Sequence, residues 1–162
     1  MLKYFDRYQE VKKIIKKTEN GNILTDNPFT ENWNENEKNS VINELKICAE
    51  NGGYIFGAYD CEKLIGFSAL KNNFFGKKYK YLQLSELHVS NGYRGLGTGR
   101  KLFEMSVGKA KEMGADKIYI SGHSAAETQN FYKKIGCIDA EEVNKFLAGK
   151  EPCDIQLEYK IK

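Results

Sequence analysis

A glycine-rich turn between an apolar strand and a helix constrains this chain more than any other feature. Residues 87 to 102 read LHVSNGYRGLGTGRKL, and glycines stand at positions 95, 97 and 99. Glycine has no Cβ atom, so successive backbone N–H groups at the start of a helix can approach a phosphate closely, and the helix dipole adds to the attraction. The segment therefore predicts a strand, a diphosphate-binding turn and a helix.

The spacing of these glycines excludes two common phosphate-binding motifs. A Walker A loop needs a glycine followed by Lys and then Ser or Thr, and no glycine in this chain has that context. A Rossmann fingerprint needs a third glycine where Arg100 or Leu102 stands. The pattern that does fit is Arg-x-x-Gly-x-Gly, matched by Arg94, Gly97 and Gly99 directly after a Leu-x-Val strand end.

This pattern resembles the motif of the GNAT superfamily of N-acetyltransferases, in which the turn binds the pyrophosphate of acetyl-CoA. A second segment, FYKKIGC at residues 131 to 137, is similar to the family's F-Y-x-x-x-G-F, with Cys137 in place of the usual aromatic residue. Together the two segments extend the resemblance over residues 53 to 162. The resemblance implies that acetyl-CoA is the co-substrate, that no metal is needed, and that a primary amine attacks the acetyl group directly in a ternary complex.

The resemblance also implies which residues contact the coenzyme. The family often has an asparagine where this chain has Ala125, and Ser124 or Asn130 can substitute for it. The end of the strand also pairs with the pantetheine arm through its backbone, which needs no particular side chain. The expected coenzyme-binding residues are Leu87, His88, Val89, Arg94, Gly95, Leu96, Gly97, Thr98, Gly99, Arg100, Ser124 and Asn130.

Acetylation of an amine requires a base for the ammonium proton and an acid for the leaving thiolate. Tyr132 is the predicted acid, since the family tyrosine lies near the coenzyme sulfur and the pKa of a phenol is near 10. Glu86 is the leading candidate for the base, while His88 and His123 compete with it because imidazole titrates near neutral pH. Strand alternation places Glu86, His88 and Ser90 on one face, and the sequence does not decide which face meets substrate.

The acceptor amine is expected to meet the N-terminal part of the chain and the last strand pair. In the family these elements line the acceptor site, and acids beside aromatic residues could attract a cationic amine. The acceptor could be an antibiotic, a polyamine, an amino acid, a peptide or a protein lysine. The candidate residues are Asp26, Phe29, Glu31, Trp33, Glu35 and Glu151.

Hydrophobic periodicity predicts a mixed α/β fold with strand hairpins at both ends and one strand-helix-strand crossover in the middle. The resemblance implies a GNAT-like fold, with a mostly antiparallel twisted sheet of about six or seven strands flanked by about four helices. An amphipathic helix is expected from residue 2 to about 20, because Leu2, Phe5, Tyr8, Val11 and Ile15 recur at helical spacing. An irregular or partly extended segment should follow. Further helices are expected at residues 37–50, 98–113 and 125–135, and strands at 54–59, 64–70, 79–89, 117–121, 138–143 and 153–161.

Length and composition favour a single acetyltransferase domain, with residues 1–52 on the acceptor side and 53–162 as the coenzyme-binding core. Four cysteines without metal-site spacing predict free thiols in a reducing compartment, and no membrane-spanning run appears, so a cytoplasmic protein is expected. A net charge of +3 does not argue for nucleic acid as a partner, although lysine clusters and ten tyrosines keep that class as a weak alternative. A non-catalytic acyl-CoA-binding module and a homodimer are the other open alternatives.

Overall fold

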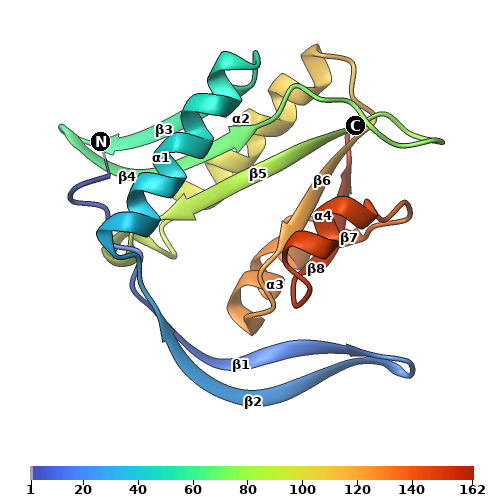
Figure 1. Ribbon diagram of the computed structural model, residues 1–162, viewed down its shortest axis with the longest axis horizontal. Coiled ribbons are helices and arrows are strands. Elements are labelled where there is room, and N and C mark those ends of the chain that lie inside the picture. Colours follow the sequence, from blue (N-terminus) through green and yellow to red (C-terminus); the bar gives the residue numbers. More distant parts are fainter. Residues whose placement is uncertain (1) are drawn as a thin grey trace.

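A computed structural model describes residues 2 to 162 of the chain. Its centre is a six-stranded sheet with the strand order β3-β4-β5-β6-β8-β7, and a separate two-stranded sheet, β1-β2, extends beneath it (Figure 1). The elements in chain order are β1 (Gln9–Thr18), β2 (Gly21–Glu31), α1 (Glu35–Glu50), β3 (Tyr54–Asp60), β4 (Lys63–Leu70), β5 (Tyr81–Val89), a short 3₁₀ helix (Asn91–Tyr93), α2 (Thr98–Glu112), β6 (Lys117–Gly122), α3 (Ala126–Lys134), β7 (Ile138–Asp139), α4 (Lys145–Lys150) and β8 (Ile155–Lys160).

The pairing of the central sheet confirms the predicted fold class. Only β5 and β6 are parallel, and every other neighbouring pair in this sheet is antiparallel. The chain crosses from β5 to β6 through α2, which packs on strands β3, β4, β5 and β6. The sheet is therefore mostly antiparallel with one strand-helix-strand crossover, as the periodicity of the sequence predicts.

Two apolar clusters hold the helices on opposite faces of the sheet. Figure 1 shows α1 and α4 on the near face and α2 on the far face. The larger cluster joins Phe103 of α2 and Tyr132 of α3 to the sheet, whereas the smaller one joins Leu45 and Cys48 of α1 to Phe67. None of the helices within residues 2–162 is long and apolar enough to cross a membrane.

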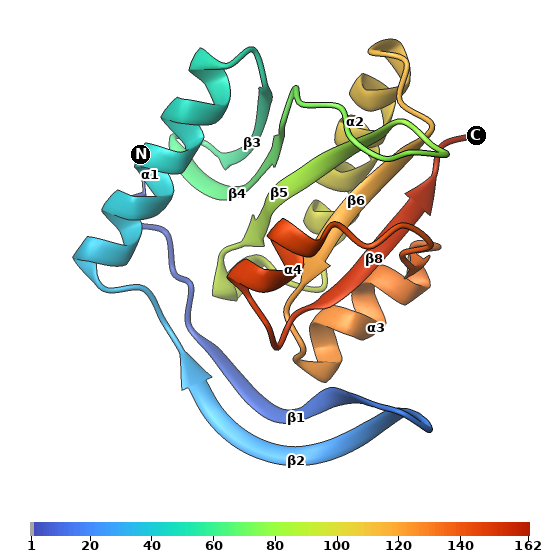
Figure 2. The ribbon, with the colours of Figure 1, turned by 45° about the vertical axis from the view of Figure 1, so that its right-hand side comes forward.

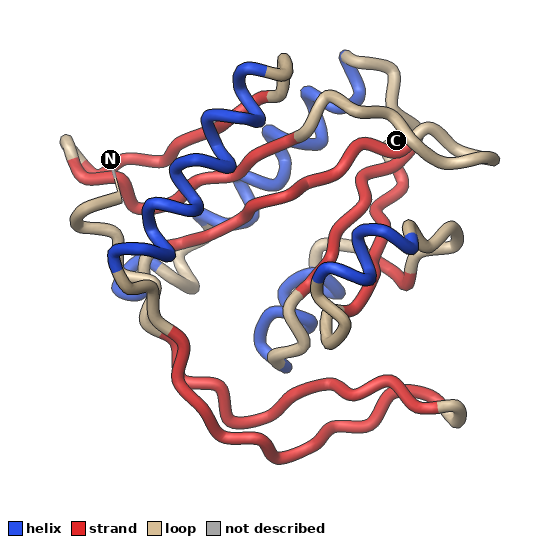
Figure 3. The backbone as a smooth tube through the Cα atoms, viewed as in Figure 1, coloured by secondary structure: helices blue, strands red, loops and turns tan. Residues whose placement is uncertain are grey.

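The predicted helix at residues 2–20 is wrong, because this region forms the antiparallel hairpin of β1 and β2. The β-branched residues Val11, Ile14 and Ile15 favour an extended backbone, and a turn at Glu19 and Asn20 places Gly21 at φ +111°, a conformation that suits glycine. The tube in Figure 3 shows both strands separated from the central sheet. The apolar spacing that suggested a helix arises partly from the segment before β1, where Leu2 and Phe5 pack into the smaller cluster.

The other expected elements are present, apart from differences at the ends and one shortened strand, and the structure adds the short helix α4, which the sequence did not predict. Helix α1 begins two residues before the predicted position, because Asn34 caps it and Glu37 completes a capping box. The strand expected at 138–143 is reduced to Ile138–Asp139. It ends early because Glu142 leaves the sheet and its carboxylate accepts the backbone N–H groups of Lys77, Lys78 and Tyr79.

Candidate active site

The site forms where β5 and β6 separate. These two strands pair only from Tyr81 to Gln83 on β5, and the remaining six residues of β5 diverge from β6. A cavity of about 1030 Å³ opens at this divergence. It is lined by β5, the glycine-rich turn, the start of α2, the end of β6, α3, α4 and the N-terminal hairpin.

The free edge of β5 offers backbone hydrogen-bond groups to this cavity. On the β4 side, Ser90 N–H donates to the Ile65 carbonyl over 2.8 Å, and His88 is paired with Phe67. In an antiparallel ladder the backbone groups of successive residues alternate in direction, so those of Leu87 and Val89 face the opposite edge. Both residues line the cavity. The backbone groups of Leu87 and the Val89 N–H can pair with an extended pantetheine arm and can polarise a thioester carbonyl, whereas the Val89 carbonyl accepts a hydrogen bond from Arg94 Nε.

The turn before α2 is open and its helix start has no side-chain cap. Gly95 and Gly97 have φ values of +78° and +87°, and no heavy atom lies within 4 Å of the place where a Cβ atom would stand on either residue. Among the described residues, no side chain caps the N-terminus of α2. Its first N–H groups are therefore left for an anion, and this open turn fits the pyrophosphate of acetyl-CoA.

Replacing Gly97 by Ala should weaken acetyl-CoA binding by at least about tenfold, because the added methyl group would stand in the space left for the phosphate and the positive φ would cost about 1 kcal/mol. Isothermal titration with acetyl-CoA measures this. Gly108→Ala in the middle of α2 is the matched control, since it also adds a methyl group into open space. It should leave coenzyme affinity unchanged and raise stability by about 0.5 to 1 kcal/mol. Equal coenzyme affinity in the two variants would contradict the assignment of the turn.

Tyr132 lies on α3 with its side chain buried at the wall of the cavity. Burial raises the pKa of its phenol well above 10, so the hydroxyl stays protonated across the physiological range. Within residues 2–162 no hydrogen bond occupies this hydroxyl. A neutral phenol without a protein partner at the wall of this cavity can donate a proton to a leaving group there.

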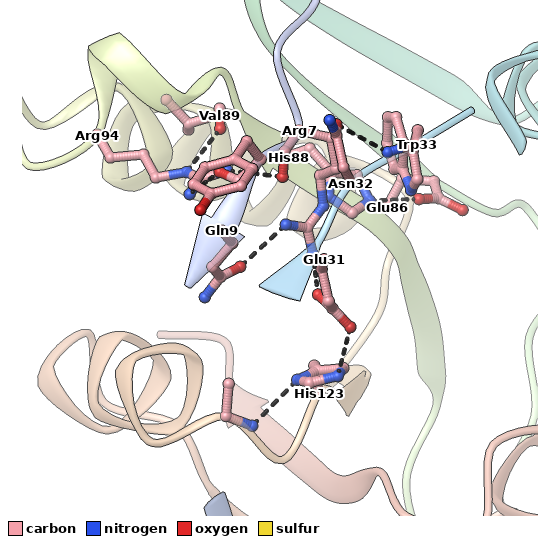
Figure 4. A network of polar contacts seen from close by, with 12 residues as sticks. Arg7, Gln9, Glu31, Asn32, Trp33, Glu86, His88, Val89, Arg94 and His123 are labelled. Atoms are coloured by element: carbon pink, nitrogen blue, oxygen red, sulfur yellow. Dashed lines mark hydrogen bonds and ion pairs between the residues drawn. The ribbon is translucent and has the colours of Figure 1, made fainter. Parts of the chain in front are cut away.

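Glu86 and His88 lie side by side on one face of β5 (Figure 4). This is the face that packs with α1, since the His88 ring contacts Phe67 of the smaller cluster. The Glu86 Oε2 and His88 Nε2 atoms are 2.7 Å apart, and the imidazole ring packs edge-on against Trp33 at a centroid distance of 4.8 Å. Glu86 Oε1 makes no hydrogen bond within the described part of the chain. The structure thus brings Glu86, His88 and Trp33 together in the cavity, with one carboxylate oxygen left for an acceptor amine or a water molecule.

His123 is held differently, at the far side of the cavity. Its Nδ1 accepts the backbone N–H of Ala125 over 3.0 Å, and its Nε2 lies 2.8 Å from Glu31 Oε1. The hydrogen bond to Glu31 raises the pKa of His123, and the same contact lowers the pKa of Glu31. Because both ring nitrogens are engaged, this geometry disfavours His123 as the base that receives the ammonium proton.

The cavity contains some of the predicted site residues and leaves others outside. Of the acceptor candidates, Glu31, Trp33 and Glu151 line it. Asp26 faces Lys13 on the outer part of the hairpin, Glu35 pairs with Lys38 on α1, and Phe29 packs against the His123 ring. The expected coenzyme residues that line the cavity are Leu87, His88, Val89, Arg94, Gly95, Gly97, Gly99 and Arg100, and those that do not are Leu96, Thr98, Ser124 and Asn130.

Several cavity residues were not expected from the sequence. Gln9 begins the hairpin, Arg7 lies in the segment that leads into it, and Asp154 precedes β8. The helix that the sequence predicts at residues 2–20 does not bring Arg7 to this cavity. The available signal was the pair of β-branched runs on either side of the Asn20-Gly21 dipeptide, which is typical of a hairpin.

Asp154→Asn should stabilise the protein at high pH. Burial raises the pKa of Asp154 from 3.8 to about 6, so its charged form costs stability above pH 6 and this cost disappears as the pH falls toward 4. Allowing for partial solvent exposure, the gain should be about 1 kcal/mol at pH 8 and near zero at pH 4. Thermal unfolding should show a rise of about 2 to 4 °C at pH 8. An equal shift at both pH values would contradict this assignment.

Comparison with known proteins agrees with this geometry. The model of the acetyltransferase (GNAT) family matches residues 19–137. No curated protein sequence matches the chain. Nourseothricin acetyltransferase has a similar structure, with a TM-score of 0.70 and 18% identity over 98% of this chain and 90% of that chain.

Two further solved structures contain acetyl coenzyme A or coenzyme A. A Bacillus anthracis str. Ames protein named as a streptothricin acetyltransferase, in complex with acetyl coenzyme A, has a TM-score of 0.67 and 20% identity over 95% of this chain and 86% of that chain. An aminoglycoside 6'-N-acetyltransferase complexed with coenzyme A has a TM-score of 0.62 and 17% identity over 80% and 84%. At these identities the likeness establishes the fold, whereas the family model covers more than half of the sequence. The chain therefore belongs to the acetyltransferase (GNAT) family and is an N-acetyltransferase.

Proposed function

We propose that this enzyme transfers the acetyl group of acetyl-CoA to a primary amine of a small molecule or peptide by direct attack in a ternary complex. The observation that carries the proposal is the cavity at the divergence of β5 and β6. This cavity is bordered by four groups that the reaction needs: the uncapped start of α2, the free backbone edge at Leu87 and Val89, the buried Tyr132 side chain and the Glu86 carboxylate. These are the donors, acid and base that amide formation from a thioester needs.

Each of these groups has a distinct part in the proposed reaction. The N–H groups from Gly97 onward hold the pyrophosphate, and the exposed Arg100 side chain adds a positive charge beside it. The backbone N–H on the free edge at Val89 polarises the thioester carbonyl. Glu86 takes the proton from the acceptor ammonium, directly or through water, and Tyr132 protonates the departing coenzyme sulfur.

The acceptor side supports a cationic amine. Glu31, Glu86, Glu151 and Asp154 all border the cavity, and Trp33 adds an aromatic surface. The structural neighbours named for nourseothricin, streptothricin and aminoglycosides suggest amine-bearing antibiotics as the first compounds to test. A homodimer and a cytoplasmic location accompany this proposal as predictions.

Two measurements test the proposal together. Thermal unfolding with acetyl-CoA at about a hundred times its Kd should show stabilisation of about 2.7 kcal/mol. Release of free coenzyme thiol should then be followed across a panel of streptothricin, aminoglycosides, polyamines, amino acids and lysine peptides. Stabilisation with no turnover on any amine would favour a non-catalytic acyl-CoA-binding module, and the absence of stabilisation would contradict the coenzyme assignment.

A further inference from the structure

The side chain of Arg94 points away from the phosphate turn to which its sequence position assigns it. Its Nε donates to the Val89 carbonyl over 3.0 Å, its Nη1 to the Tyr8 carbonyl over 2.8 Å and its Nη2 to the Arg7 carbonyl over 3.3 Å. Figure 4 shows the guanidinium directed toward Val89. One side chain thus joins the last residue of β5 to the segment that leads into β1.

Other contacts connect the same two segments. Asp6 N–H donates to the Ser90 hydroxyl over 3.0 Å, Asn91 N–H donates to the Asp6 carbonyl over 2.8 Å, and the Asn91 side-chain amide donates to Asp6 Oδ2 over 3.3 Å. Residues 6–8 are therefore attached to residues 89–94 by side-chain and backbone hydrogen bonds. The segment they meet is the end of β5 and the start of the coenzyme turn.

The hairpin that begins at this junction forms a wall of the cavity. Arg7, Gln9 and Glu31 line the cavity, and the Arg7 guanidinium donates to Gln9 and Glu31. The hairpin is attached again at its middle, where Ile15 N–H donates to the Ser124 carbonyl over 2.7 Å. In Figure 2 the two strands curve past α3. The position of this wall therefore depends on the junction at residues 6–8, on the contact at Ser124 and on the ion pair between Glu31 and His123.

We propose that Arg94 is a positioning residue for the acceptor half of the site, which fixes the hairpin wall onto the coenzyme turn, and that its side chain is not a phosphate ligand. Three carbonyl oxygens occupy the guanidinium, and its planar fork of N–H donors suits this arrangement where a lysine would supply only a point charge. The proposal rests on the proposed function for the identity of the acceptor site. It also predicts coupling, because a ligand that orders the turn also orders the wall.

Hydrogen exchange in the coenzyme-free protein tests this role without any substrate. Arg94→Ala should speed amide exchange in β1 and β2 by about tenfold, because the segment that leads into β1 loses the two hydrogen bonds that the Arg94 guanidinium donates to it. Arg94→Lys should behave similarly. The affinity for acetyl-CoA, measured by titration, should change by less than about threefold in both variants.

Arg100→Ala is the matched control, since Arg100 is exposed in the first turn of α2 and also borders the cavity. It should weaken acetyl-CoA binding several-fold and leave the rate of amide hydrogen exchange in β1 and β2 unchanged. If Arg94→Ala does not fold, Asp6→Ala loosens the same junction without altering the turn and should raise hairpin exchange with unchanged coenzyme affinity. Once an acceptor is known, its KM should rise in these junction variants more than kcat falls.

The outcomes separate this inference from the proposed function. Unchanged hairpin exchange in Arg94→Ala, or a loss of acetyl-CoA affinity like that of Arg100→Ala that Arg94→Lys restores, would overturn the positioning role. A wild-type protein that does not bind acetyl-CoA would overturn the proposed function instead. In that case, faster hairpin exchange in Arg94→Ala would still support the junction and contradict only its connection to acetyl transfer.

Discussion

Tyr132→Phe should lower kcat by at least about a hundredfold while the affinity for acetyl-CoA stays nearly the same. Loss of a positioned general acid typically costs a factor of 10² to 10⁴ in rate. The hydroxyl has no hydrogen-bond partner within residues 2–162, so its removal should leave the folded state intact. The raised pKa of Tyr132 keeps the phenol protonated, so the wild-type rate should show no loss of this acid up to pH 9. Steady-state kinetics and acetyl-CoA titration measure both effects.

Tyr159→Phe is the control for this prediction. Tyr159 packs edge-to-face on Phe103 at a centroid distance of 5.2 Å and does not border the main cavity. Removal of its hydroxyl should leave kcat within about twofold of the wild-type value. A Tyr132→Phe enzyme that turns over as fast as Tyr159→Phe would rule out the assignment of Tyr132 as the acid.

Glu86→Gln should lower kcat by about 10² to 10³ and leave acetyl-CoA affinity nearly intact. The amide oxygen of glutamine can still accept a hydrogen bond from His88, so the variant removes the charge and the basicity with little change in geometry. The deficit should shrink as the pH approaches the pKa of the acceptor amine, because a neutral amine no longer needs a base. A pH profile of kcat measures this trend.

Glu44→Gln is the matched control, because Glu44 also borders the cavity but comes from α1. Its kcat should stay within a few-fold of wild type. Unchanged turnover in Glu86→Gln would disprove the base assignment, and a larger loss in His88→Asn than in Glu86→Gln would transfer the role to His88. Neither result is expected, since Glu86 presents a free oxygen to the cavity.

The coenzyme half of the fold could be predicted from local sequence because its chemistry depends on local geometry. Gly97 needs a positive φ just before a helix, and the residues around it alternate in a way that only a strand followed by a turn and a helix satisfies. Such patterns extend over only a few residues, so they can be recognised without knowing how the rest of the chain folds. Apart from the short helix α4, the order of strands and helices after residue 53 follows from the same reasoning.

The N-terminal hairpin could not be predicted with the same security. Val11 and Ile15 satisfy both a helical spacing and a β-branched strand, and the energy that decides between them comes from pairing with β2 and from contact with Ser124. Ser124 lies far away in sequence, whereas β2 follows β1 after a turn of two residues, Glu19 and Asn20. The incorrect helix prediction gave no reason to place Arg7 and Gln9 in the site. They line the cavity because the hairpin packs against it.

The sequence by itself determined the family, the coenzyme turn and the residue types available for acid and base, because each is encoded within a short run of the chain. Only the tertiary structure decided how the long-range partners are arranged. It paired Glu86 with His88, engaged both nitrogens of His123, buried Tyr132 and turned the Arg94 side chain from the phosphate turn toward the hairpin. The reason is that direction, burial and hydrogen-bond occupancy depend on residues that meet only after folding. The glycines predict where the donor binds, and the packing around them shapes the predicted place for the acceptor.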